Sequence, residues 1–154
     1  YHKVLELLEF TKEYTYESLK KYLENLVAEG RISDEMRECV RIKDLLCFLN
    51  TDIAKRMRKC SENGKLFREQ PFVLGVPAKE MLLIQGVIDV WMEEEDGLTV
   101  VDYKTDRVKT AGELKERYGS QLKYYGEALE RLTGKKVKEK IIYSMFLQKE
   151  ITIS

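Results

Sequence analysis

The sequence is poor in the residues that mark most specialised protein classes. It contains 2 prolines, 1 tryptophan and 1 histidine among 154 residues, and its 27 Lys and Arg balance its 27 Asp and Glu. The zero net charge gives no global prediction of a nucleic-acid partner, and no apolar run is long enough to span a membrane. The apolar share of 44% with 35% charged residues is typical of a folded domain and argues against a disordered chain.

Cysteine is also scarce. Cys39, Cys47 and Cys60 are an odd number at no recognised metal spacing, and the first two lie in a helical pattern where a cysteine commonly acts as a small buried residue. We therefore expect structural, reduced thiols over a redox or metal role. Reduced thiols and the lack of a signal peptide favour the cytoplasm.

The chain opens on Tyr1-His2-Lys3 without an initiator methionine, and its pattern is helical from the first residue. We expect 1–154 to be a single domain belonging to a larger polypeptide. Within it, we expect a helical part over 1–63 and an α/β part over 64–154.

Apolar periodicity and capping residues predict the elements. Helices are expected over 4–10, 16–29 and 51–60, and a single helix is expected from Ser33 or Asp34 through Leu46. A long helix is expected over 111–132. Strands are expected over 65–75, 81–92, 98–105, 137–147 and 151–153. A helix of about twenty residues between strands is a natural crossover to a parallel strand. The predicted fold class is therefore α/β, with a central mixed sheet flanked by helices and an N-terminal helical segment.

Two predictions concern how these elements are covered. The long helix carries an apolar stripe that must face the sheet, made of Leu114, Tyr118, Leu122, Tyr125, Leu129 and Leu132. The strand around Asp89 is apolar on both faces, which predicts a central strand covered on both sides.

Charged residues interrupt two of the apolar strands. Asp89 lies in the second strand, and Asp102-Tyr103-Lys104 lies in the third. Residues two apart in a strand project to the same side, so Asp102 and Lys104 project together. The acidic turn 93–97 can fold the strands into a hairpin that brings Asp89 beside Asp102. Two such carboxylates repel unless a hard cation such as Mg²⁺ or Mn²⁺ binds them; the alternative is a structural ion pair with Lys104.

Lys104 and four other residues are candidates for the same site. Lys104 could position or deprotonate a water at a metal and offset charge on phosphorus, or could be a surface lysine. Gln121 and Tyr125 are neighbours at i, i+4 on the long helix, where Gln121 could bond a carboxylate or a DNA phosphate, or be a satisfied core amide. His2 could be a further metal ligand or structural, and Glu69 could add to the site or be a half-exposed edge residue.

These residues occur in one order: His2, Glu69, Asp89, Asp102-Tyr103-Lys104, Gln121 and Tyr125. That order resembles the RecB-like branch of the PD-(D/E)XK nuclease superfamily, and specifically the C-terminal nuclease domain of AddA-type helicase–nuclease subunits. The quoted residues of the resemblance run from His2 to Tyr125, and the resemblance covers essentially the whole chain.

The resemblance implies a restriction-endonuclease-like fold and a Mg²⁺- or Mn²⁺-dependent deoxyribonuclease. It implies Asp89, Asp102, the Tyr103 backbone carbonyl and His2 as metal ligands, Lys104 as the catalytic lysine, and Gln121 and Tyr125, with Glu69, as DNA-binding or site-organising residues. Members of the family act as exonucleases in double-strand-break end processing and recombinational repair. They are joined to an ATP-driven helicase portion and paired with a second, AddB-like subunit, so DNA and both of these are the implied partners.

The chain also departs from the family pattern. The Gly-Thr pair that precedes the histidine in the family is absent, and no Gly-x-x-x-x-Gly-Lys-Ser/Thr motif is present. Helicase and ATPase activity are therefore not expected of this chain. A catalytically silent DNA-binding or subunit-docking module of the same fold is the alternative function.

Overall fold

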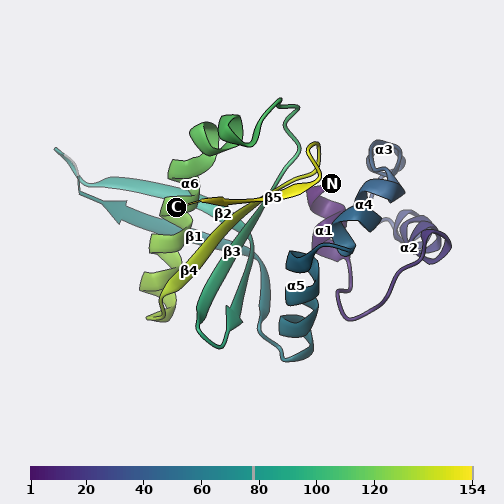
Figure 1. The fold of residues 1–154 in the computed structure, drawn as a ribbon, viewed down its shortest axis with the longest axis horizontal. Coiled ribbons are helices and arrows are strands. Elements are labelled where there is room, and N and C mark those ends of the chain that lie inside the picture. The colour runs from purple at the N-terminus through teal and green to yellow at the C-terminus, as the bar shows by residue number, and fades with distance from the viewer. Residues whose placement is uncertain (78, 154) are drawn as a thin grey trace. The chain divides into compact units, whose positions relative to one another are not determined.

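The computed structural model describes residues 1–77 and 79–153. The chain divides into two compact units, Tyr1–Asn63 and Gly64–Ser154. The first unit is helical and the second is built on a sheet (Figure 1).

The helices of the first unit begin where the sequence provides capping residues. They are α1 (His2–Leu7), α2 (Tyr16–Ala28), α3 (Asp34–Cys39), α4 (Ile42–Leu49) and α5 (Asp52–Glu62). The side chains of Thr15, Ser33 and Thr51 each accept a hydrogen bond from the backbone N–H three residues later. These contacts satisfy N–H groups that a helix leaves unpaired at its start, and they confirm the predicted starts of α2, α3 and α5.

The prediction of one helix from Ser33 through Leu46 is wrong. The backbone is extended at Val40 (φ −99°, ψ 124°) and at Arg41 (φ −93°, ψ 122°), so the segment is split into α3 and α4. Val40 and Ile42 are both buried, and residues two apart face the same side only in an extended chain. Packing of these two side chains therefore overrides the helical pattern.

The three cysteines are free thiols in different environments. Cys60 is buried, Cys47 is half-buried and Cys39 is exposed. The expectation of a buried residue is therefore wrong for Cys39, which lies at the end of the short helix α3 that the break at Val40 creates.

The second unit contains a five-stranded mixed sheet in the order β1-β2-β3-β4-β5. Its elements are β1 (Leu66–Val76), β2 (Leu82–Glu94), β3 (Gly97–Lys104), α6 (Ala111–Thr133), β4 (Val137–Ser144) and β5 (Lys149–Ile153). Strands β1, β2 and β3 form an antiparallel meander, and α6 then crosses to β4, which is parallel to β3. The predicted α/β fold with a mixed sheet is confirmed.

Helix α6 packs against the sheet with most of its predicted stripe. Thr110 caps its first turn, and Gly134 ends it in the left-handed conformation (φ 71°) that glycine adopts without strain. Leu114, Leu122, Tyr125 and Leu129 are buried in the core beneath the helix. Leu132 is 61% exposed, so the stripe ends one turn earlier than predicted.

Strands β1 and β2 extend past the rest of the sheet as a long hairpin (Figure 1). Strand β2 pairs with β3 only from Val90 to Glu94, whereas it pairs with β1 from Leu82 to Met92. On one face of the free part, Val73 is 64% exposed and Leu83 is 61% exposed. The predicted covering of β2 on both faces therefore fails in its first half, and the middle strand of the sheet is β3.

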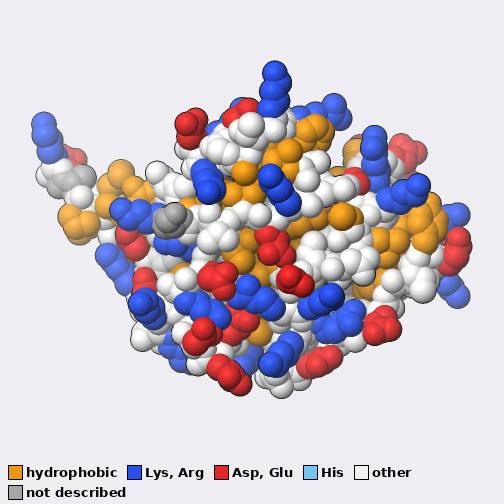
Figure 2. Space-filling view, in the orientation of Figure 1, with side chains coloured by type: hydrophobic (Ala, Val, Ile, Leu, Met, Phe, Trp, Pro, Cys, Tyr) orange, Lys and Arg blue, Asp and Glu red, His pale blue; other side chains and the backbone are white. Residues whose placement is uncertain are grey.

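Charges of both signs are interspersed over the visible face of the molecule (Figure 2). Among the described residues, no helix combines the length and the hydrophobicity needed to cross a bilayer.

Candidate functional site

Asp89 and Asp102 lie where strands β2 and β3 separate. The last register pair between the two strands is Val90–Val101, so the two acids are the next residues on either side of this fork. One carboxylate oxygen of Asp89, Oδ2, accepts a hydrogen bond of 2.9 Å from the backbone N–H of Tyr103. The predicted hairpin therefore does bring Asp89 beside Asp102. Because β2 and β3 no longer pair at this point, the Asp89 side chain accepts the hydrogen bond from the Tyr103 N–H in place of a backbone carbonyl.

Asp102 is a buried carboxyl group, 2% exposed. Burial, followed by the charge of Asp89, raises the pKa of Asp102 to about 7, although Lys104 acts in the opposite direction. Among the described residues, no donor makes a hydrogen bond of good geometry to its Oδ2. A buried carboxylate whose pKa stays raised although an ammonium lies beside it, next to a second carboxylate, is a donor set that fits a hard divalent cation.

The ammonium group of Lys104 contacts three groups of this site. Its Nζ lies 2.9 Å from Oδ2 of Asp102 as an ion pair and donates a 3.0 Å hydrogen bond to Oε1 of Gln121. The same atom lies 3.9 Å from the centre of the Tyr118 ring. The position of the Lys104 ammonium is therefore fixed by three neighbours, and Gln121 is its hydrogen-bond partner on α6.

Tyr125 lies in the wall beneath the acids. It is buried, and its ring packs edge-on against Phe72 of β1 with 5.4 Å between the ring centres. Burial, followed by the charges of Asp102 and Asp89, raises the pKa of the Tyr125 hydroxyl. Tyr125 therefore lies close enough to feel both carboxylates, as its position four residues after Gln121 suggested.

Tyr118 is a site residue that the sequence assigned only to the apolar stripe. Its hydroxyl donates a 2.7 Å hydrogen bond to Oδ2 of Asp106, which also pairs with Nη1 of Arg117 at 3.2 Å. The hydrogen bond from Tyr118 is the largest of the causes that lower the pKa of Asp106. The spacing of three between Tyr118 and Gln121 places both on one helix face, but the same spacing fits a core tyrosine, so the sequence alone did not separate the two.

Glu69 interrupts β1 with an unusual backbone. It falls between the register pairs Arg68–Val90 and Gln70–Ile88, which places it across from Asp89. Its φ is 51°, a left-handed conformation that is strained for a residue with a Cβ atom. Strain of this kind collects at functional sites, so the position of Glu69 supports the prediction that it contributes to the site.

The remaining predicted ligands are His2 and the carbonyl of Tyr103. His2 lies on α1 in the first unit and its side chain is exposed, so its role as a ligand stays a prediction. Tyr103 lies between Asp102 and Lys104 on β3 and bonds Asp89 through its N–H. Among residues 1–77 and 79–153, no three His, Cys, Asp or Glu side chains are grouped to hold a metal, so the two acids need a backbone or water ligand beside them.

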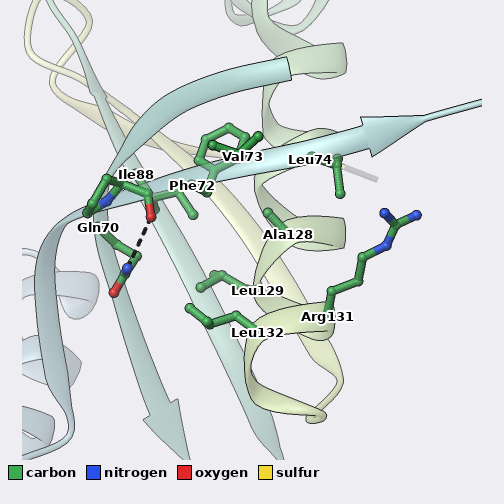
Figure 3. A pocket seen from close by; sticks show the side chains of 10 residues that line it. Gln70, Phe72, Val73, Leu74, Ile88, Ala128, Leu129, Arg131 and Leu132 are labelled. Carbon is green, nitrogen blue, oxygen red and sulfur yellow. Dashed lines mark hydrogen bonds between the residues drawn. The ribbon is translucent and has the colours of Figure 1, made fainter. Parts of the chain in front are cut away.

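An apolar cavity of about 330 Å³ lies between β1 and α6 (Figure 3). Phe72, Leu74, Ile88, Leu129 and Leu132 are among the side chains that line it, and the Gln70 amide bonds the Pro71 carbonyl at its edge. None of the predicted site residues lines this cavity. The candidate site is therefore the strand fork itself.

Comparison with known proteins identifies the family. A family model described as the PD-(D/E)XK nuclease superfamily matches residues 1–151. The chain is 36% identical over 197 residues to an ATP-dependent helicase/nuclease subunit from Lachnoclostridium phytofermentans, a match that covers 99% of this chain and 14% of the relative. It is 39% identical over 166 residues to the protein of the same name from Carboxydothermus hydrogenoformans, again covering 99% of this chain and 14% of the relative.

A protein of that name from Clostridium kluyveri is 36% identical over 155 residues, which cover 92% of this chain and 12% of the relative. The chain thus spans 12% to 14% of the length of these curated relatives. With a family match over nearly its whole length and a sheet that places both acids and the lysine together, the chain belongs to the PD-(D/E)XK nuclease superfamily.

Proposed function

We propose that this chain is a Mg²⁺- or Mn²⁺-dependent DNA nuclease domain that hydrolyses phosphodiester bonds as an exonuclease during the processing of double-strand breaks for recombinational repair. The observation that carries the proposal is the pair of acids at the fork of β2 and β3, with Lys104 held against Asp102 by Gln121. The family and the names of the relatives support a nuclease domain.

Asp89, Asp102 and the Tyr103 carbonyl would hold the cation, with His2 as a further ligand. A bound divalent cation supplies a Lewis acid and lowers the pKa of a coordinated water. The Asp89 carboxylate is oriented for this task because its Oδ2 is fixed by the Tyr103 N–H. The Lys104 ammonium offsets only part of the penalty of burying Asp102 beside Asp89, because the pKa of Asp102 is still raised, so a bound cation would relieve the remainder.

Lys104 would orient the attacking water and offset the charge that develops on the phosphate. Its ammonium is fixed in place by a carboxylate and an amide oxygen, which reduces the freedom of a long side chain. Gln121 would organise the site through this bond, and Tyr125 and Glu69 would support the wall and the strand on either side of the acids.

The names of the relatives join a nuclease to an ATP-dependent helicase. We infer that this chain works beside a helicase portion of the same polypeptide and a second, AddB-like subunit, in the cytoplasm. The absence of the ATPase motif from the sequence is consistent with a division of labour in which unwinding belongs elsewhere.

The test is cleavage of single-stranded DNA with Mg²⁺ or Mn²⁺, with and without EDTA. We expect cleavage that EDTA abolishes, and a loss of about 10²- to 10³-fold in Lys104→Ala, which removes an electrostatic contact to the transition state. Asp102→Ala should lose both cleavage and Mn²⁺ binding. Metal-dependent cleavage that survives either substitution would show that this is not the site.

Calorimetry separates the nuclease from a silent binding module of the same fold. We expect the wild-type chain to bind Mn²⁺ with a Kd in the millimolar range or tighter. The Asp102→Asn variant should not bind Mn²⁺. A wild-type chain that binds DNA but neither binds Mn²⁺ nor cleaves would instead be a DNA-binding or docking module.

A further inference from the structure

The Lys104 ammonium has three N–H donors and three neighbours. Two neighbours are acceptor oxygens, from Asp102 and Gln121, and the third is the face of the Tyr118 ring at 3.9 Å. The face of an aromatic ring attracts a cation through its negative quadrupole. The ring therefore bounds the ammonium on the side that the two oxygens leave open.

The Tyr118 ring is itself fixed from a second direction. Its hydroxyl donates to Oδ2 of Asp106 at 2.7 Å, and Arg117 binds the same oxygen at 3.2 Å. Asp106 follows Lys104 by two residues, whereas Tyr118 and Arg117 lie on α6. The chain at and just after the end of β3 is thus joined to α6 twice, by the bond of Lys104 to Gln121 and by the bonds of Asp106 to Tyr118 and Arg117.

The three neighbours of Lys104 respond differently when a cation occupies the acids. Asp102 would share its negative charge with the cation, which weakens its ion pair with the ammonium. The ring neither coordinates a cation nor exchanges a proton with Lys104. Its hold on the ammonium is therefore independent of the occupancy of the acids.

We propose that Tyr118, fixed by Asp106, is a positioning residue that holds the Lys104 ammonium over the site when a cation and a DNA phosphodiester are bound, an inference that rests on the proposed nuclease function. Tyr118 contacts neither the cation nor the phosphate in this role. It acts through Lys104, and Asp106 acts through Tyr118.

The kinetic test compares Tyr118→Leu with Tyr118→Phe in the full chain. The leucine removes the ring, so kcat should fall by about 2- to 30-fold, the range that an ammonium over an aromatic face supports. The leucine substitution should not change KM for single-stranded DNA or the affinity for Mn²⁺, because in this role Tyr118 contacts neither the DNA nor the metal ion. The phenylalanine keeps the ring and should restore kcat to within about 3-fold of the wild type.

Double mutants test whether these residues act through one another. Asp106→Ala should lower kcat less than Tyr118→Leu and should add nothing in the Tyr118→Leu background. Tyr118→Leu should likewise add nothing in the Lys104→Ala background. The matched control is Tyr124→Leu, which removes a tyrosine from the same helix outside the described contacts of Lys104. A loss of kcat that persists in the Lys104→Ala background, or an equal loss in Tyr124→Leu, would overturn the proposal.

Proton NMR of the metal-free chain gives a readout that does not require catalysis. The Cε protons of Lys104 should be shifted upfield by the ring in the wild type and in Tyr118→Phe, and the shift should vanish in Tyr118→Leu. Unshifted protons in the wild type would overturn the placement of Lys104 even if DNA is cleaved. If the shift is present but the wild type cleaves no DNA with either metal, the failure lies in the proposed function, and the catalytic role of Tyr118 falls with it.

Discussion

Asp102 shows how much a single buried residue constrains this site. Its carboxyl is almost fully buried and faces the charge of Asp89, and these two effects raise its pKa to about 7. A group in this position favours its protonated form unless a cation binds it. The ionised Asp102 side chain therefore destabilises the metal-free fold, and the same burial and neighbouring charge favour the binding of a divalent cation.

The stability of the metal-free chain should consequently fall as pH rises. The pKa of Asp102 is about 7 in the native state and 3.8 for the ordinary group, so the native state binds more protons between these values. The free energy of unfolding then decreases from pH 3.8 to about 7 and levels off above it. Thermal melts in EDTA at pH 5 and pH 8 measure this, since about 1 kcal/mol shifts Tm by about 2–4 °C in a chain of this size.

Asp102→Asn isolates this contribution from the other groups that titrate. The amide has nearly the shape of the protonated carboxyl and does not ionise, so the difference between wild type and variant should favour the variant more at pH 8 than at pH 5. Mn²⁺ at pH 8 should raise the Tm of the wild type alone, because a ligand of the native state stabilises it. A difference that is the same at both pH values would disprove the assignment of the raised pKa to Asp102.

Sequence periodicity was sufficient for the acids and the lysine but not for their surroundings. Alternation along a strand and a short turn predicted that Asp89, Asp102 and Lys104 would meet, and the bond from the Tyr103 N–H to Asp89 and the Lys104–Asp102 ion pair show that they do. Tyr118 was missed because a tyrosine in an apolar stripe has the same spacing whether it fills a core or faces a cation. The left-handed backbone of Glu69 has no sequence pattern, because left-handed positions favour glycine and no glycine marks this one.

At the scale of the elements, the predicted parts that hold depend on local chemistry. The capped starts of α2, α3 and α5, the meander, and the parallel crossover follow from residues adjacent in sequence. The break at Val40 and the separation of β2 from β3 depend on packing and pairing with distant residues. The candidate site lies at one of these departures, which is where local preference and tertiary structure are expected to disagree.

Two glycines of the second unit should respond in opposite ways to alanine. A Cβ atom on Gly86 would lie 2.9 Å from Cε1 of Phe72, whose ring packs against Tyr125 beneath the acids. We expect Gly86→Ala to destabilise the fold by about 1–3 kcal/mol, because overpacking displaces these rings. Gly119 lies in α6, where an added Cβ atom would meet nothing within 4 Å, so Gly119→Ala should stabilise the helix by about 0.5–1 kcal/mol.

Urea unfolding of the two variants measures both effects on one scale. The same variants test the wall of the site, since Gly86→Ala should also reduce cleavage whereas Gly119→Ala should leave Phe72 and Tyr125 in place. A neutral Gly86→Ala would mean that Phe72 can rotate away without a penalty, and that the pair with Tyr125 is not a rigid support.

At the scale of the molecule, the chain carries the groups for chemistry but little charge for holding DNA. Its 27 basic and 27 acidic residues cancel, and both signs are interspersed on the face seen in Figure 2. The relatives are far longer, since the chain covers only 12% to 14% of them. The β1–β2 hairpin leaves the apolar side chains of Val73, Leu83 and Val87 exposed on one face. These features fit a nuclease domain that by itself has little charge with which to hold DNA.

This chain alone should therefore bind single-stranded DNA weakly and with a strong dependence on salt. Affinity for a phosphate backbone comes mainly from basic residues that displace counterions, and in this chain the acidic residues equal the basic ones in number. We expect a Kd weaker than about 1 μM near physiological salt. The affinity should rise as salt is lowered, and a plot of log K against log salt concentration should have a slope of about −0.7 for each phosphate contacted. Fluorescence anisotropy with a labelled oligonucleotide across a salt series measures this, with EDTA or Asp102→Asn preventing cleavage. Nanomolar binding that persists at physiological salt would show that the chain has its own DNA-binding surface, and that the delivery of DNA by a helicase portion is not needed to explain its action.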